Sequence, residues 1–312
     1  MRRFLGRETL ATLHRESRVL DVCTLVIVPS MSVMIVVICG MYDHFLVLGA
    51  VLAQGWLFQW FGLINHEFFV HRQVGGPKGA PLIALVFTIP IFLSFTRYRY
   101  AHKLHHRFVG SCRDSEGYKQ DINTRLKRLL FCTYIGVAWA ASGRMGKGRT
   151  PYFHLGEADR DTIRRAKVEA ALQLLFCCLV VWLWIEFPQA VTLGYIIPVL
   201  VVLPTLNALR ILFEHAELQP ENSYFIASRF RCSLLEELAF LWDAGEFHLI
   251  HHYFPNIPFY RMRAARRAIN AFFDMRQIPP TSGRMRLLYA WFIDQRPHRT
   301  WWQSRVKFRG TT

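Results

Sequence analysis

The chain has 312 residues, of which 52% are hydrophobic, and a formal net charge of +16 from 38 Lys and Arg against 22 Asp and Glu. Its long charge-free apolar runs argue against an ordinary soluble protein and favour one integral membrane domain over residues 1–312. The basic residues flank these runs and no nucleic-acid-binding motif is present, so we expect no nucleic-acid partner. The seven cysteines form no C-x-x-C pair, which argues against a zinc or disulfide framework.

Four apolar stretches are long enough to cross a bilayer, and a short turn joins the members of each pair. They cover residues 20–41, 45–64, 168–187 and 190–213. We therefore predict an all-α fold with two membrane hairpins. Two further apolar stretches, at 80–96 and 129–142, are short, and prolines interrupt the first of them. We expect both to be re-entrant or interfacial on the inner side.

The positive charges predict an orientation for these hairpins. No Lys or Arg occurs from Asp21 to Phe69 or from Val168 to Leu209, so both outer turns lack positive charge. The positive-inside rule then places both termini in the cytoplasm, together with a helical cap that joins the spans. Basic and aromatic residues alternate within 259–312, and we expect this segment to lie on an anionic membrane surface.

Three histidine clusters occur beside the apolar runs, and they contain eight of the chain's 13 histidines. The clusters are His66-Glu-Phe-Phe-Val-His71, His102-Lys-Leu-His105-His106 and His248-Leu-Ile-His251-His252. Neutral imidazole is a good ligand for iron, copper, nickel or zinc. Eight imidazoles exceed what one metal needs, so the sequence predicts two metals held in the cytoplasmic cap.

The spacing inside the clusters predicts how the imidazoles point. On an α-helix, His-x-x-His-His places three side chains within about 100° of one face, so they can converge on one cavity. His66 and His71 are five residues apart, or about 140° on an α-helix. We therefore expect this pair to flank a site or to serve different metals.

The three clusters, in this order, resemble the histidine boxes of the membrane fatty acid desaturase and hydroxylase superfamily. The stretch from His248 to Tyr260 is especially similar to the third box of bacterial acyl-lipid desaturases. This resemblance implies a non-haem di-iron site, O2 as co-substrate and an external electron donor similar to ferredoxin or cytochrome b5. No haem-binding His-Pro-Gly-Gly segment or iron–sulfur spacing is present in the chain.

The resemblance also implies a ninth ligand. Members of the superfamily often have a further histidine between boxes two and three, and His215 matches that position. Asn207 lies on the helix face of Glu214 and not on that of His215, so we do not expect it to be a ligand. The implied metal ligands are His66, His71, His102, His105, His106, His215, His248, His251 and His252.

Several charged residues near the clusters allow two interpretations each. Glu67, Asp243 and Glu246 are candidates to accept a hydrogen bond from an imidazole, or they are ordinary solvated charges. Arg210 and Glu214 form a polar stripe at the end of the fourth span. This stripe is either functional, as charges at such depth often are, or an ion pair that reaches to the membrane surface.

The resemblance implies an O2-dependent desaturase acting on a fatty-acyl or other lipid chain. A hydroxylase or ketolase of the same superfamily is the alternative, with a carotenoid, an alkane or a small amino-acid-derived natural product as substrate. A zinc-dependent membrane hydrolase and a metal transporter belong to different classes. A transporter is expected to carry metal ligands within its spans, and these spans have almost none.

Overall fold

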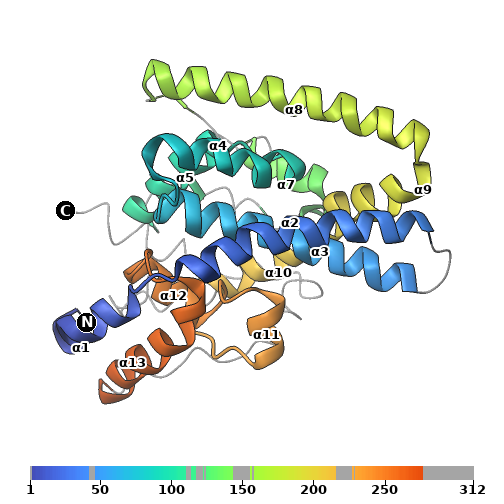
Figure 1. The fold of residues 1–312 in the computed structure, drawn as a ribbon. Helices are drawn as coiled ribbons and strands as arrows, with labels where there is room; N and C mark the ends of the chain where they lie inside the picture. The colour runs from blue at the N-terminus through green and yellow to red at the C-terminus, as the bar shows by residue number, and fades with distance from the viewer. Residues whose placement is uncertain are drawn as a thin grey trace.

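The chain folds into a bundle of helices in a computed structural model (Figure 1). The structure describes residues 2–41, 46–109, 114–116, 122, 124–142, 155–156, 158–215, 227 and 229–276, and the side chains of residues 2, 141, 212, 213 and 215 lie outside this description. Every regular element in the described ranges is helical, which confirms the predicted all-α class.

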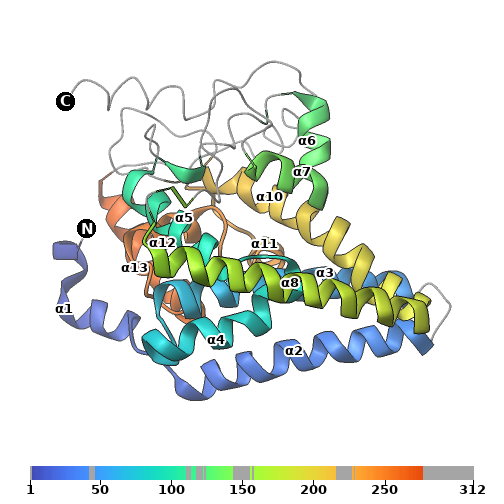
Figure 2. The same ribbon diagram turned by 90° about the horizontal axis from the view of Figure 1, so that it is seen from above.

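The first predicted hairpin consists of α2 (Arg18–Met41) and α3 (Leu46–Ile64), which run side by side in opposite directions (Figures 1 and 2). A buried hydrogen bond of 2.7 Å from Gln54 Nε2 to Ser32 Oγ joins the two helices. The helix α3 continues directly into the π-helix η1 (Asn65–His71). The second span therefore carries the first histidine cluster at its end.

The second hairpin consists of α8 and a return leg of four helical pieces. Its elements are α8 (Arg160–Glu186), α9 (Pro188–Val191), η4 (Thr192–Ile196), η5 (Pro198–Val202) and α10 (Leu203–His215). The Asp159 side chain accepts the Thr162 N–H at 2.7 Å and so begins α8. Pro198 lacks a backbone donor, and it is the first residue of the π-helix η5, which follows the π-helix η4 closely.

Within the described residues, four helical segments are long and apolar enough to cross a membrane, in agreement with the four predicted spans. They are Arg18–Met41, Leu46–His71, Arg160–Glu186 and Pro188–Ile211. The helix α8 lies along one side of the bundle, and its outer face is uncovered (Figure 1). Large apolar side chains such as Leu174 and Trp182 are exposed there. Such a face suits contact with lipid, and the chain is therefore a membrane protein.

The apolar stretch at 80–96 forms a bent pair of helices. The helices α4 (Gly76–Thr88) and η2 (Ile89–Ile91) meet α5 (Phe95–Phe108) at 98°. Phe92 between them has a left-handed backbone with φ of 52°. A bend of this kind occurs in a re-entrant loop and in a broken span, so the re-entrant placement stays a prediction. The stretch at 129–142 belongs to α6 (Arg125–Phe131) and α7 (Tyr134–Ala141), which are too short to span.

The remaining described elements include α1 (Arg2–Leu13), α12 (Glu246–Tyr253) and α13 (Met262–Met275) at one end of the membrane helices and α11 (Leu234–Ala239) beside α3 (Figure 1). The short helix η6 (Phe259–Arg261) directly precedes α13. The apolar side of α13, including Ile269, Phe272 and Phe273, is buried in a core shared with α1 and α12. These apolar residues, which we expected against the membrane, pack inside the protein instead. Residues 277–312 of the predicted surface segment lie outside the described residues.

Candidate metal centre

The π-helix η1 changes the expected direction of the first histidine pair. A π-helix bonds each residue to the one five positions along, so residues i and i+5 lie one turn apart. The rings of His66 and His71 are 5.0 Å apart between centroids, and both imidazoles belong to one group of possible metal ligands. The expectation that they flank a site or serve different metals was wrong, because it assumed α-helical geometry.

The other two clusters are on short helices whose beginnings are fixed by side chains and backbone. Ser94 accepts the Arg97 N–H at the start of α5, which carries His102, His105 and His106. Gly245, with φ of 56°, precedes α12, and a side chain on it would meet the Phe230 carbonyl oxygen at 2.7 Å. The turn before the third cluster therefore requires glycine.

Five imidazoles converge on one point. The Nε2 atom of His102 lies 2.9 Å from those of His66 and His106 and 3.0 Å from that of His71. The Nε2 atom of His251 lies 3.0 Å from those of His66 and His106, which closes a ring of four nitrogens. All three histidine clusters contribute to this first group, and His66, His102 and His251 are buried.

A second group consists of His105, His248 and His252, whose candidate ligand atoms lie within 4.8 Å of one another. The Nε2 atoms of His248 and His252 are 3.0 Å apart. This group adjoins the first, because the ring centroids of His106 and His252 are 4.5 Å apart. The spacing His-x-x-His-His thus brings the side chains of one helix to two neighbouring sites.

The donor set fits two metal ions. Neutral imidazoles present lone pairs, and several lone pairs that point together repel one another unless a cation lies between them. Metal–nitrogen bonds of about 2.1 Å place neighbouring nitrogens about 3.0 Å apart in an octahedral site and about 3.4 Å apart in a tetrahedral one. The separations of 2.9–3.0 Å in the first group match the octahedral case. Burial, and next the neighbouring His66 and His71, lower the pKa of His251 well below its ordinary value, so the imidazole stays neutral and able to bind metal.

Carboxylates lie behind several of these imidazoles. Asp114 Oδ1 is 2.9 Å from His105 Nδ1. Asp243 approaches His248 Nδ1 at 3.4 Å and His66 Nδ1 at 3.7 Å. Such contacts favour the proton on Nδ1 and leave Nε2 free to bind a metal.

Among the three acidic residues expected to orient imidazoles, only Asp243 contacts an imidazole in the described part of the chain. Glu67 pairs with Arg72 at 3.1 Å, and Glu246 pairs with Arg266 at 3.2 Å. Glu246 therefore links α12 to α13, whereas Glu67 pairs with the residue that caps the end of its own π-helix η1. Asp114 was not predicted from the sequence. It follows the second box in a stretch without helical periodicity, so nothing in the pattern indicates where its side chain points.

The polar stripe at the end of the fourth span points into the protein. Arg210 forms ion pairs with Glu214 and with Asp243, the latter at 2.6 Å, and it donates to Asn207 Oδ1 at 3.0 Å. Glu214 is only 2% exposed. The alternative of an ion pair that reaches to the membrane surface is therefore wrong. Glu214, Asp243 and His248 lie close enough to hold a metal, but both carboxylates already pair with the Arg210 guanidinium.

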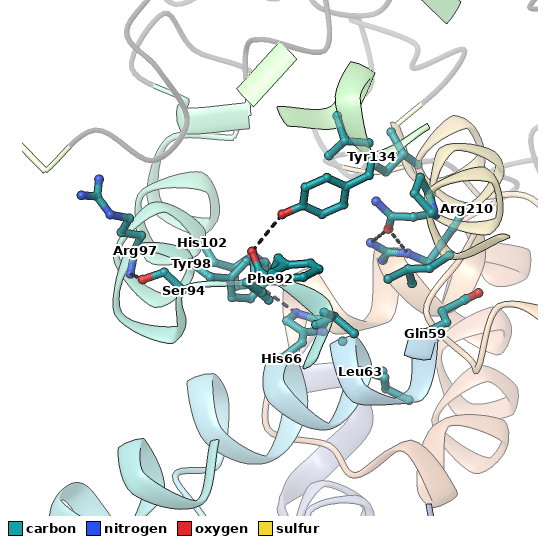
Figure 3. Close-up of a pocket in the computed structure, with 18 of the residues that line it drawn as sticks. Gln59, Leu63, His66, Phe92, Ser94, Arg97, Tyr98, His102, Tyr134 and Arg210 are labelled. Atoms are coloured by element: carbon teal, nitrogen blue, oxygen red, sulfur yellow. Dashed lines mark hydrogen bonds between the residues drawn. The ribbon is translucent and has the colours of Figure 1, made fainter. Parts of the chain in front are cut away.

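A cavity of about 710 Å³ adjoins the histidine groups (Figure 3). It is lined by His66 and His102 of the first group and His248 of the second. Figure 3 shows Phe92, Tyr98, His66 and His102 side by side at this cavity, with Arg210 on the opposite side. The volume lies within the usual range for small-molecule sites. The expected ninth ligand is the last residue of α10, but the His215 side chain lies outside the described residues.

The sequence of this chain also matches the model of a known protein family. The family model described as fatty acid desaturase matches residues 43–284, which include all three histidine clusters and three of the four spans. No curated protein matches the chain. The chain belongs to the fatty acid desaturase family, and its histidine groups and membrane helices are those of a desaturase- or hydroxylase-type oxidoreductase.

Proposed function

We propose that this protein is an O2-dependent desaturase that introduces a double bond into a fatty-acyl or other lipid chain at a histidine-held di-iron site. The observation that supports it is the pair of adjacent imidazole groups at a cavity between membrane helices. One group offers five donors and the other offers three among the described residues. A neutral donor set leaves the positive charge of the metals largely uncompensated, which suits oxidative chemistry better than a carboxylate-rich site.

Each histidine group has its own part in this proposal. His66, His71, His102, His106 and His251 hold one iron, and His105, His248 and His252 hold the other together with His215. Bound iron supplies the one capacity that side chains lack, the activation of O2 with electrons from an external carrier. The protein orients the imidazoles, excludes water and holds one carbon of the substrate beside the metals.

The cavity explains how a substrate carbon reaches the centre. Leu63 of α3 precedes His66 of η1 by about one turn, and both residues line the cavity. Phe92 and Tyr134 line it from other elements, and the Tyr134 hydroxyl donates to the Phe92 carbonyl oxygen at 3.1 Å. An apolar chain that enters between these side chains ends at His66, one of the proposed ligands.

The proposed orientation puts the histidine groups, both termini and nearly all Lys and Arg residues on the cytoplasmic side. An acidic electron donor similar to ferredoxin or cytochrome b5 can dock on this basic side. Single cysteines replacing Gln189 and Arg267, in a background without the native cysteines, test this orientation. A membrane-impermeant thiol reagent applied to intact cells should label the first position and spare the second. Labelling of the second position alone would reverse the orientation.

The decisive experiment measures metal and product on the purified full chain. We expect about two irons per chain and an alkene product when a reduced ferredoxin, O2 and a lipid extract are supplied. His251→Ala should lose iron and activity, whereas His14→Ala, a histidine outside both groups, should keep both. An alcohol product would favour the hydroxylase alternative, and one zinc per chain without oxidation products would favour the hydrolase.

A further inference from the structure

Asp243 touches both imidazole groups with a single side chain. Its Oδ1 lies 3.4 Å from Nδ1 of His248, a member of the second group. Its Oδ2 lies 3.7 Å from Nδ1 of His66, a member of the first group. The residue is only 6% exposed, so little solvent competes for these contacts. One carboxylate therefore lies behind a ligand of each proposed metal site.

We propose that Asp243 is a positioning residue shared by the two metal sites, so that removing its charge weakens metal binding at both sites together. This inference rests on the proposed di-iron function. An acceptor behind a ligating imidazole fixes the proton on Nδ1, sets the plane of the ring and raises the basicity of Nε2. Asp243 offers one oxygen to each of the two rings, which an amide in the same place cannot do.

The backbone just before Asp243 is strained, which supports a functional role for the position of this residue. Leu241 and Trp242 both have left-handed backbones, with φ of 56° and 55°. Two consecutive residues of this kind without glycine are strained, and such strain concentrates at functional sites. The strained turn follows α11 and ends at Gly245, the residue before α12. It places the carboxylate between α10 and the third histidine cluster.

Arg210 holds the carboxylate in this orientation. Its guanidinium donates to Asp243 Oδ2 at 2.6 Å, and it also pairs with Glu214. Glu214 Oε1 is itself 3.8 Å from His248 Nδ1. Arg210 therefore neutralises part of the buried negative charge and fixes which oxygen of Asp243 faces His66. Glu116 also lies near both groups, at 4.0 Å from Nδ1 of His102 and 3.9 Å from Nε2 of His105, but both of these distances are longer than those of Asp243.

Asp114 provides a matched comparison. Its Oδ1 lies 2.9 Å from Nδ1 of His105, which belongs to the second group. Asp114 is buried to a similar degree, at 7% exposed against 6% for Asp243. Removing its charge should therefore affect the second site more than the first. Comparison of the two substitutions separates an effect of one shared carboxylate from a general effect of lost buried charge.

The test uses the full chain in detergent, loaded with ⁵⁷Fe(II) without O2. Competition with a chelator gives the affinity, and Mössbauer spectra resolve the two sites. Asp243→Asn should lower iron affinity at both sites by about 10- to 100-fold. Asp114→Asn should lower the iron affinity mainly at the second site. Asp161→Asn, which changes an exposed aspartate at the start of α8, should lower it at neither site. A thermal unfolding midpoint for each variant shows whether it is folded.

Two outcomes would overturn the inference. The first is Asp243→Asn with both irons bound at wild-type affinity, and the second is a loss confined to one site. If this variant does not fold, Asp243→Glu replaces it, because it keeps the charge and moves both oxygens. The Mössbauer parameters of both sites should then change, and an unchanged spectrum at either site would refute a shared role. The wild-type chain tests the proposed function separately. If it binds fewer than two irons, the di-iron proposal itself fails, whereas two bound irons with an unaffected Asp243→Asn variant would overturn only the role of Asp243.

Discussion

The phenol ring of Tyr98 lies on the imidazole ring of His102, with ring centroids 5.3 Å apart and planes only 7° from parallel. The two residues are one turn apart on α5, where side chains at i and i+4 meet. His102 is central to the first group, since its Nε2 lies within 3.0 Å of the corresponding atoms of His66, His71 and His106. The Tyr98 ring therefore helps to fix the plane of a proposed ligand.

Substitution of Tyr98 should show that the ring matters for metal binding and that the hydroxyl does not. Tyr98→Phe keeps the stacked ring, so iron per chain should equal that of the wild type. Tyr98→Leu removes the flat surface, and iron affinity of the first site should fall about tenfold, as for other side chains that orient ligands. Chelator competition measures both variants. Loss of iron in Tyr98→Phe would show that the hydroxyl itself is required.

Glu169 links α8 to the start of the helix that carries the second histidine cluster. Its buried carboxylate accepts the backbone N–H of Thr96 at 3.1 Å and the hydroxyl of Ser94 at 2.5 Å. A carboxylate at a helix N-terminus also interacts favourably with the helix dipole. Glu169→Gln should therefore lower the free energy of unfolding by about 1–3 kcal/mol. Glu186→Gln, an exposed glutamate on the same helix, is the control, and equal thermal midpoints for the two variants would contradict the predicted role.

Acid should destabilise the metal-free protein through its buried imidazoles. Burial keeps the pKa of His251 well below its ordinary value, whereas in the unfolded chain the ring takes up a proton below about pH 6.5. The unfolded state then binds more protons, so stability falls as the pH falls through that range. The thermal unfolding midpoint of protein from which a chelator has removed the metal should decrease as the pH is lowered from 8 to 5.5. His251→Asn should show a weaker dependence, and an equal slope in both proteins would refute this cause.

The spans and the histidine clusters could be predicted from the sequence because each depends on local composition. Apolar runs of sufficient length must bury their backbone polar groups as helices, so the four spans follow from length and charge alone. The pattern His-x-x-His-His likewise fixes the direction of three side chains once a helix is assumed. These local rules predicted that the imidazoles of α5 and of α12 lie close together, but the expected convergence of all three on one cavity was wrong, because each helix divides its imidazoles between the two groups.

The rest depends on backbone geometry or on contacts between distant segments. Residues Asn65–His71 adopt a π-helix, which turns His71 toward His66 and which no propensity rule for α-helices indicates. Asp114 reaches His105 from a stretch without periodic pattern. The ion pair between Arg210 and Asp243 joins residues that are 33 positions apart. The strained turn at Leu241 and Trp242 has no sequence signal either, because neither residue type favours a left-handed backbone.

The second metal site needs more donors than the described residues supply, and His215 is the candidate. The first group has five imidazoles and the second has three. His215 ends α10 directly after Glu214, whose Oε1 lies 3.8 Å from Nδ1 of His248. The end of α10 is therefore beside the second group. A histidine at this point can complete the site, whereas the alternative is a surface histidine favoured by the helix dipole.

Substitution distinguishes these two roles of His215. As a ligand, His215→Ala should reduce bound iron from about two to about one per chain and abolish turnover, and His215→Gln should not restore either fully. As a surface residue, both variants should keep wild-type iron and activity, with stability changed by at most about 1 kcal/mol. His154→Ala, an isolated histidine, is the control for effects of histidine removal as such. The first group keeps all five of its own donors in these variants, so the iron that remains should give the Mössbauer signal of the first site. Loss of the first-site signal instead would show that His215 binds the metal of the first group.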